Sequence, residues 1–160
     1  MPRNFPKGEI RHARLQLETP GFVRTTAVTG ARRRGQLYEE RVHREFAVRY
    51  AGYLQSPWFH FYDEQGAKWC QPDGLIINPH KGLITIVEAK LRHTNDACCS
   101  LFGLYLPVVR SLFGGFYEFE CVEVCHWYDP AVLCDRVPTL CAYPDNPRRG
   151  QFNVHIYDGR

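Results

Sequence analysis

Residues 71–90, QPDGLIINPHKGLITIVEAK, contain two apolar runs separated by the polar sequence NPHKG at 78–82. Asn-Pro and Lys-Gly pairs are typical of turns, so this stretch predicts a β-hairpin. Asp73, Glu88 and Lys90 stand at the ends of these otherwise apolar strands. Charged side chains are rarely buried unless they are paired or bind a metal ion. These three residues are therefore candidates for a functional site.

The pairing of the hairpin decides whether the three charged groups meet. If the turn makes Asn78 and Leu83 the closing pair of an antiparallel hairpin, five further residues along each strand bring Asp73 opposite Glu88. Their Cβ atoms would then lie about 4.5–5.5 Å apart. Because side chains alternate along a strand, Glu88 and Lys90 share one face. The sequence therefore predicts that two carboxylates and one ammonium group project toward the same point.

Two facing carboxylates repel each other, and a hard divalent cation removes this conflict. Mg²⁺ binds carboxylate oxygens and keeps several waters, and Mn²⁺ is its expected substitute. Beside such a metal, Lys90 would orient or deprotonate a water, or neutralise charge that develops on a phosphate. This chemistry suits hydrolysis of a phosphodiester. The alternative is a surface ion pair between Glu88 and Lys90, with Asp73 serving a turn; it explains each residue alone but not the three together.

The composition predicts a single soluble domain. The 160 residues are 44% hydrophobic and 23% charged, which is ordinary for a globular protein. No apolar run approaches the roughly 18 residues of a membrane span and the first residues lack a signal-peptide core, so we expect a cytoplasmic protein without a membrane partner. The seven cysteines are expected to be reduced thiols. A zinc site would need Cys121, Cys125, His126 and Cys134, which lack the paired C-x2-C spacing.

Hydrophobic periodicity predicts an α/β fold with a mixed sheet. A helix is expected over 36–50, with Tyr38, Val42 and Phe46 as its buried stripe. A second helix begins at Thr94 or Asn95 and should kink or split at Pro107. Strands are expected at 21–28, twice within 58–70, at 74–78, 83–90 and 116–128, and at 152–157.

Two motifs carry a resemblance to a known family. Pro72-Asp73, an apolar strand and Glu88-Ala89-Lys90 together resemble the PD-(D/E)xK nuclease superfamily. The sequence RRRGQLYEER at 32–41 is similar to the Gly-x-x-x-Glu helix start of the archaeal Holliday-junction-resolvase branch, and this spacing selects Glu39. Helical periodicity agrees, because Glu39 shares the inward face of the helix while Glu40 is turned away.

The resemblance implies a fold, a cofactor and residue roles. It implies a restriction-endonuclease-like core with a central mixed β-sheet flanked by helices, over residues 32–128. A basic N-terminal arm, 1–31, and a proline-rich C-terminal extension, 129–160, lie outside it within the single domain 1–160. Asp73 and Glu88 would bind Mg²⁺ together with the Ala89 backbone carbonyl. Lys90 would act on the nucleophilic water, and Glu39 would complete the carboxylate set or hold a water.

Basic residues near the motif are candidates for phosphate contacts. They are Arg32, Arg33, Arg34, Arg92 and His93. Arg92 and His93 are equally placed to cap the strand or to meet Asp96. Trp58, Trp69 and Trp127 are expected to serve packing rather than base stacking. No recognition element for a base sequence is visible, so cleavage is expected to be structure-selective or weakly sequence-selective.

Together these features favour a Mg²⁺-dependent DNA endonuclease similar to small phage-type DNA-processing enzymes. Cutting both strands with one site per chain would require a homodimer. The alternative is a nuclease-fold structural or DNA-end-binding component of a larger assembly, such as a phage head or neck, which would place the protein in the virion. Retention of Asp73, Glu88 and Lys90 favours the enzyme.

Overall fold

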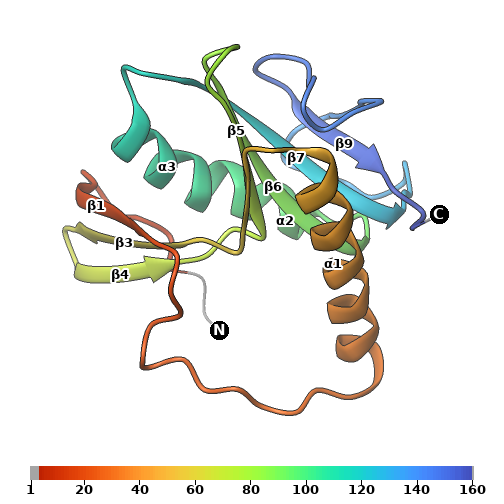
Figure 1. Ribbon diagram of the computed structural model, residues 1–160, viewed down its shortest axis with the longest axis horizontal. Coiled ribbons are helices and arrows are strands. Elements are labelled where there is room, and N and C mark those ends of the chain that lie inside the picture. Colours follow the sequence, from red (N-terminus) through yellow and green to blue (C-terminus); the bar gives the residue numbers. More distant parts are fainter. Residues whose placement is uncertain (1–3, 160) are drawn as a thin grey trace.

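The computed structural model describes residues 4–159 and contains a six-stranded mixed sheet in the order β2-β5-β6-β7-β9-β8 (Figure 1). The first three strands are antiparallel, whereas β6, β7, β9 and β8 run parallel to one another. The predicted mixed sheet of an α/β fold is therefore confirmed. The strands are β2 (Tyr53–Gln55), β5 (Gly74–Asn78), β6 (Leu83–Arg92), β7 (Glu118–Trp127), β8 (Pro138–Leu140) and β9 (Phe152–Ile156).

Helices cover both faces of this sheet (Figure 1). On one face, α1 (Gly30–Arg49) buries the predicted stripe of Tyr38, Val42 and Phe46 against alternate side chains of β6 and β7. The helix begins six residues earlier than expected, so its first turns include the arginine-rich segment 32–34. Gly30 and Gly35 obscured this start, because glycine lowers the helix propensity of a segment.

The other face is covered by a continuous helical stretch, α2 (Asn95–Ser100), η1 (Leu101–Tyr105) and α3 (Leu106–Phe113). Pro107 was expected to kink or split this helix. The α-helix is indeed split: the π-helical segment η1 separates α2 from α3, and Pro107 lies in the first turn of α3, where a missing N–H is tolerated. Among residues 4–159 this stretch is the one helix long and apolar enough to cross a membrane. Residues such as Leu101 and Val108 are nevertheless fully buried, as in the core helix of a soluble protein.

A second, three-stranded sheet in the order β1-β3-β4 packs on the same core. The hairpin of β3 (Trp58–Asp63) and β4 (Gly66–Cys70) is the predicted one, whereas β1 (Arg11–Gln16) replaces the strand expected at 21–28. A register shift between Arg11 and Arg14, with His12 at a φ of 53°, breaks the alternation that would have revealed β1.

Both terminal segments contribute to the fold. The strand expected at the C-terminus is β9, and it pairs in parallel with β7 inside the main sheet. Its Phe152 and Val154 are among the buried core residues. The expected division between a core ending at 128 and an extension therefore does not correspond to a boundary of the sheet. Within the N-terminal arm, residues 1–3 lie outside the described part of the chain.

Candidate active site

The hairpin of β5 and β6 has the register on which the predicted site depends. Asn78 pairs with Leu83 and Gly74 pairs with Val87. Apolar side chains on both sides of this hairpin are buried in the core and hold the register. Asp73 and Glu88 lie directly beyond the last paired residues of the hairpin. Burial raises the pKa of Asp73 and the charge of Glu88 raises it further, so the two carboxylates lie close together.

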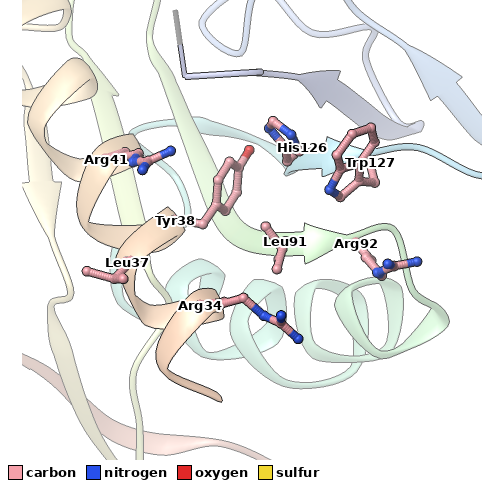
Figure 2. Close-up of a pocket in the computed structure, with 8 residues that line it drawn as sticks. All are labelled: Arg34, Leu37, Tyr38, Arg41, Leu91, Arg92, His126 and Trp127. Atoms are coloured by element: carbon pink, nitrogen blue, oxygen red, sulfur yellow. The ribbon is translucent and has the colours of Figure 1, made fainter. Parts of the chain in front are cut away.

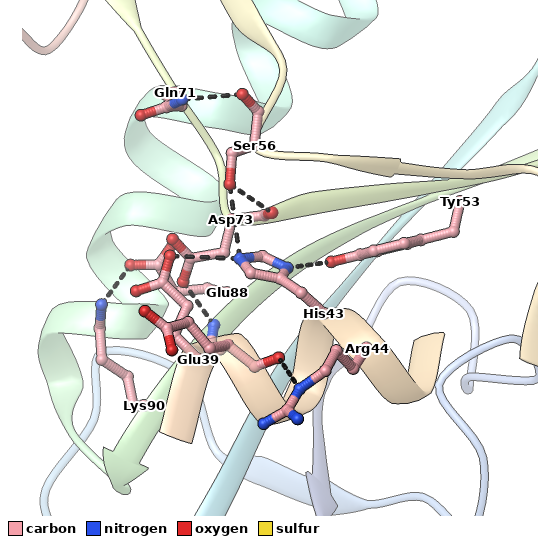
Figure 3. Close-up of polar contacts among 11 residues, drawn as sticks. Glu39, His43, Arg44, Tyr53, Ser56, Gln71, Asp73, Glu88 and Lys90 are labelled. Atoms are coloured by element: carbon pink, nitrogen blue, oxygen red, sulfur yellow. Dashed lines mark hydrogen bonds and ion pairs between the residues drawn. The ribbon is translucent and has the colours of Figure 1, made fainter. Parts of the chain in front are cut away.

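Lys90 and a backbone amide complete the inner part of the site (Figure 3). The Lys90 ammonium lies 2.5 Å from Glu88 Oε1, and Glu88 is only 4% exposed. The Ala89 N–H donates a hydrogen bond of 2.7 Å to Asp73 Oδ2. Asp73 and Lys90 are half-buried, so solvent and a substrate can reach them.

Glu39 reaches the same site from α1 (Figure 3). Its Oε1 lies 3.3 Å from Nε2 of His43, one helical turn later. The His43 side chain is buried, and its Nδ1 lies 2.6 Å from the Tyr53 hydroxyl. His43 therefore fixes the orientation of Glu39. Sequence reasoning missed this residue, although its position four residues after Glu39 on the inward side of α1 was a usable signal.

The loop that carries Asp73 is held by neighbouring backbone and side-chain groups. The Ser56 N–H donates to the Asp73 carbonyl at 2.8 Å, and the Gln71 side-chain amide donates to the Ser56 carbonyl at 2.7 Å. The ring of Tyr53 covers Gly74, where an added Cβ would lie 2.5 Å from a ring carbon. Only glycine fits beneath the ring, so Gly74 allows Tyr53 to meet His43.

Negative charge exceeds positive charge in the site. Burial raises the pKa of Asp73 well above its ordinary value, and the neighbouring charges of Glu88 and Glu39 raise it further. The Lys90 ammonium and the hydrogen bond from Ala89 oppose this shift without cancelling it. Burial alone would lower the pKa of Lys90, but the adjacent carboxylates outweigh it and raise this pKa, so Lys90 stays protonated at neutral pH.

The donor set suits a cation that keeps most of its own water. Within residues 4–159, no group of three or more His, Cys, Asp or Glu side chains is arranged to hold a metal ion. Mg²⁺ does not require such a group, because one or two carboxylates with waters and substrate phosphates usually suffice. Asp73 and Glu88 are two carboxylates that could hold such an ion, and the third acid, Glu39, is close enough to raise the Asp73 pKa.

The arginines proposed as phosphate contacts are exposed, but His93 is not. Arg32, Arg33 and Arg34 lie in the first turns of α1, and Arg92 ends β6. His93 is only 3% exposed, and its Nδ1 lies 2.7 Å from Oε2 of the fully buried Glu123. The expected phosphate contact of His93 is therefore wrong, because the ring faces the core rather than the surface.

The residues of the alternative zinc site are not brought together. Cys121 and Cys125 lie on the face of β7 that packs in the core with α2 and α3. His126 points to the opposite face, where its ring contacts Tyr38 of α1. Cys134 lies apart from these and approaches His93, with Sγ 3.5 Å from Nε2. All seven cysteines are free thiols, as expected.

The three tryptophans do not share one role. Trp58 and Trp69 are half-buried and pack against each other and Phe22, in agreement with the expected packing role. Trp127, at the carboxyl end of β7, is 58% exposed. The packing role expected for Trp127 is therefore wrong.

No protein-family model, curated protein or solved structure matches this chain.

Proposed function

We propose that the protein is a Mg²⁺-dependent DNA endonuclease that hydrolyses phosphodiester bonds. One observation carries the proposal: three acids from three elements meet around one lysine. Glu39 comes from α1, Asp73 precedes β5, and Glu88 and Lys90 lie on β6. Burial raises the pKa of Asp73, and the charges of Glu88 and Glu39 raise it further, which supports a site that is short of positive charge. A divalent cation supplies that charge, and a phosphodiester is the substrate class that such a centre activates.

The residues present fit Mg²⁺ and divide the chemistry between them. Asp73 and Glu88 would hold the ion, together with the Ala89 carbonyl that the family resemblance implies. When bound, Mg²⁺ polarises a phosphoryl oxygen and lowers the pKa of a coordinated water. The protonated Lys90 is suited to stabilising negative charge on the phosphate and to orienting the attacking water rather than to removing its proton. Glu39, fixed by His43, is placed to hold a water or to complete the carboxylate set.

The topology supports the resemblance to PD-(D/E)xK nucleases. A helix with the selected glutamate precedes an antiparallel hairpin with the paired acids, and β7 follows in parallel after the second helical segment. A restriction-endonuclease-like core is accordingly part of the proposal. DNA is its proposed partner, and double-strand cutting would require a homodimer. An enzyme of this kind would suit a phage-encoded DNA-processing role.

Cleavage of supercoiled plasmid in the presence of Mg²⁺ or Mn²⁺ tests the proposal. Nicking or linearisation is expected for the wild type and should disappear in EDTA, in Asp73→Asn and in Lys90→Ala. Lys81→Ala is the matched control for lysine removal, because Lys81 lies at the exposed tip of the same hairpin. Glu40→Gln serves in the same way for Glu39→Gln, because Glu40 is the exposed neighbour on α1.

The outcome separates the enzyme from a scaffold. Loss of cleavage in the site variants but not in the two controls would establish the nuclease and its residues. The proposal fails if the wild type leaves plasmid, branched and single-stranded DNA intact with either metal, or if Lys90→Ala cleaves as well as Lys81→Ala. A nuclease-fold structural or DNA-end-binding component would then be the better interpretation.

A further inference from the structure

A second concave site lies between α1 and the carboxyl ends of β6 and β7 (Figure 2). The pocket has a volume of about 380 Å³. Three arginines and three ring side chains contribute to its walls, whereas the described lining contains no acidic residue. The six residues are Arg34, Tyr38, Arg41, Arg92, His126 and Trp127.

The three guanidinium groups give this pocket its charge. Arg34 and Arg41 are seven residues apart on α1, so they lie on one flank of the helix. Arg92 approaches from the end of β6. Within residues 4–159, no ion pair joins an acidic side chain to any of the three. These charges attract an anion, and guanidinium forks match phosphate oxygens well.

Trp127 gives the pocket an aromatic surface. An indole that is 58% exposed is unusual, because tryptophan is highly buried on average. The ring of His126 packs nearly perpendicular to it, with the ring centroids 4.4 Å apart. His126 in turn contacts Tyr38 on α1. Trp127 thus packs against His126 while more than half of its surface stays exposed, and such a ring is suited to stacking with a nucleobase.

The pocket lies close enough to the active site to contact the same DNA strand. Arg92 is two residues after Lys90 on β6, which places their Cα atoms about 7 Å apart. Trp127 is the residue that pairs with Arg92 across the two strands. A DNA strand held at Lys90 would thus reach the pocket within one or two nucleotides.

We infer that this pocket binds a single unpaired nucleotide of the DNA strand next to the scissile phosphate, with its base on Trp127 and a phosphate between Arg34, Arg41 and Arg92. The position of the scissile phosphate rests on the proposed function. A pocket of about 380 Å³ suits one nucleotide, and a base within a duplex has both faces covered by its neighbours. The substrate class is therefore DNA with a single-stranded segment at the cleavage point, such as a flap, an overhang or a branch.

Fluorescence anisotropy with two DNA probes, recorded in EDTA, tests the pocket without cleavage. One probe is a blunt hairpin duplex, and the other is the same hairpin with a short single-stranded 3′ or 5′ tail. The wild type should bind the tailed probe more tightly. Trp127→Ala should weaken binding to the tailed probe by roughly 5- to 150-fold, the usual cost of losing one base stack. Its affinity for the blunt hairpin should change little.

Two further variants test whether the effect depends on an aromatic ring at position 127 rather than on the loss of any exposed aromatic residue. Trp127→Phe keeps an aromatic face and should restore most of the preference for the tailed probe. Phe116→Ala removes another exposed aromatic residue, 82% exposed and located before the start of β7, far along that strand from Trp127. It should bind both probes like the wild type. Circular dichroism spectra of each variant check that the fold is retained.

The inference is overturned if the wild type binds neither probe, if it binds both equally, or if Trp127→Ala and Phe116→Ala give the same affinity for the tailed probe. Lys90→Ala allows nucleotide binding by the pocket to be tested separately from the proposed nuclease activity. If Lys90→Ala retains the tail preference while the wild type cleaves no DNA, the pocket is upheld and the nuclease is rejected. If cleavage depends on Lys90 but no tail preference exists, the nuclease is upheld and the pocket is rejected.

Discussion

Replacing Asp73 by asparagine should stabilise the metal-free protein. Two carboxylates about 5 Å apart repel by about 3 kcal/mol at an effective dielectric constant of 20. The attraction between Asp73 and the Lys90 ammonium offsets part of this energy. Asparagine removes the repulsion, and its carbonyl oxygen can still accept the hydrogen bond from Ala89. A net gain of about 1–2 kcal/mol follows, which corresponds to a rise in Tm of about 2–8 °C for a chain of this size.

The gain should depend on pH in a defined direction. Because the pKa of Asp73 is raised in the folded protein, the wild type loses stability as the pH rises above the pKa of Asp73 in the unfolded chain. The difference in Tm between Asp73→Asn and the wild type should therefore be smallest near pH 4 and grow toward pH 8. Differential scanning fluorimetry at pH 4, 6 and 8 in EDTA measures it. Added Mg²⁺ should raise the Tm of the wild type but not that of Asp73→Asn.

Asp63→Asn provides a comparison in which the change in Tm at pH 8 should have the opposite sign. The Lys68 ammonium, 2.6 Å away, and backbone N–H groups lower the pKa of Asp63 to about 2, although burial opposes the shift. This carboxylate stabilises the fold above its ordinary pKa, and that contribution is lost as the pH falls toward 2. Asp63→Asn should therefore lower the Tm at pH 8. The reasoning is refuted if Asp73→Asn also lowers the Tm at pH 8, or leaves it unchanged.

Three further substitutions test the surroundings of the site. Gly74→Ala should lower the free energy of unfolding by about 1–3 kcal/mol, because the new Cβ would displace the Tyr53 ring. Urea denaturation measures this change, and an unchanged midpoint of the urea transition would contradict the close contact. His43→Ala should slow metal-dependent cleavage by about 10- to 100-fold without weakening DNA binding, because the His43 side chain orients Glu39 and does not contact DNA. An unchanged cleavage rate would show that His43 has no role in the site. Burial raises the pKa of Glu123 from 4.5 to about 8, so the wild type should lose stability as the pH rises from about 4.5 to about 8 and little more above that. Glu123→Gln cannot ionise, and its Tm relative to the wild type should rise between pH 5 and 9; a constant difference would show that this carboxyl does not titrate.

The hairpin and its site could be predicted because they depend on local information. The NPHKG turn fixes the pairing of Asn78 with Leu83, and side-chain alternation then determines which groups face each other. Glu39 could be selected in the same way, since the periodicity of α1 places it beside the buried stripe. In each case the relevant neighbours are either close in sequence or joined by one short turn.

The features that were missed depend on contacts between distant segments. His93 follows Arg92 in a sequence that looks exposed, yet it is buried because Glu123, thirty residues later, provides a partner. Trp127 alternates as an ordinary strand residue, and it is exposed at the end of β7, beyond Cys125, the last residue of this strand that pairs with β9. The parallel pairing of β9 with β7 spans a long connection, which no local pattern reveals.

The buried acids of this chain separate structural roles from the candidate active site. Asp63 is paired with Lys68, which lowers its pKa, so its charge stabilises the fold. Glu123 lies deep in the core between His93 and the Thr94 N–H, and its raised pKa favours the neutral form. Asp73 differs from both, because burial raises its pKa and two neighbouring carboxylates, Glu88 and Glu39, raise it further, while the residue stays partly exposed. Like charges held together at an accessible point cost stability, and a bound cation is the simplest factor that would offset this cost.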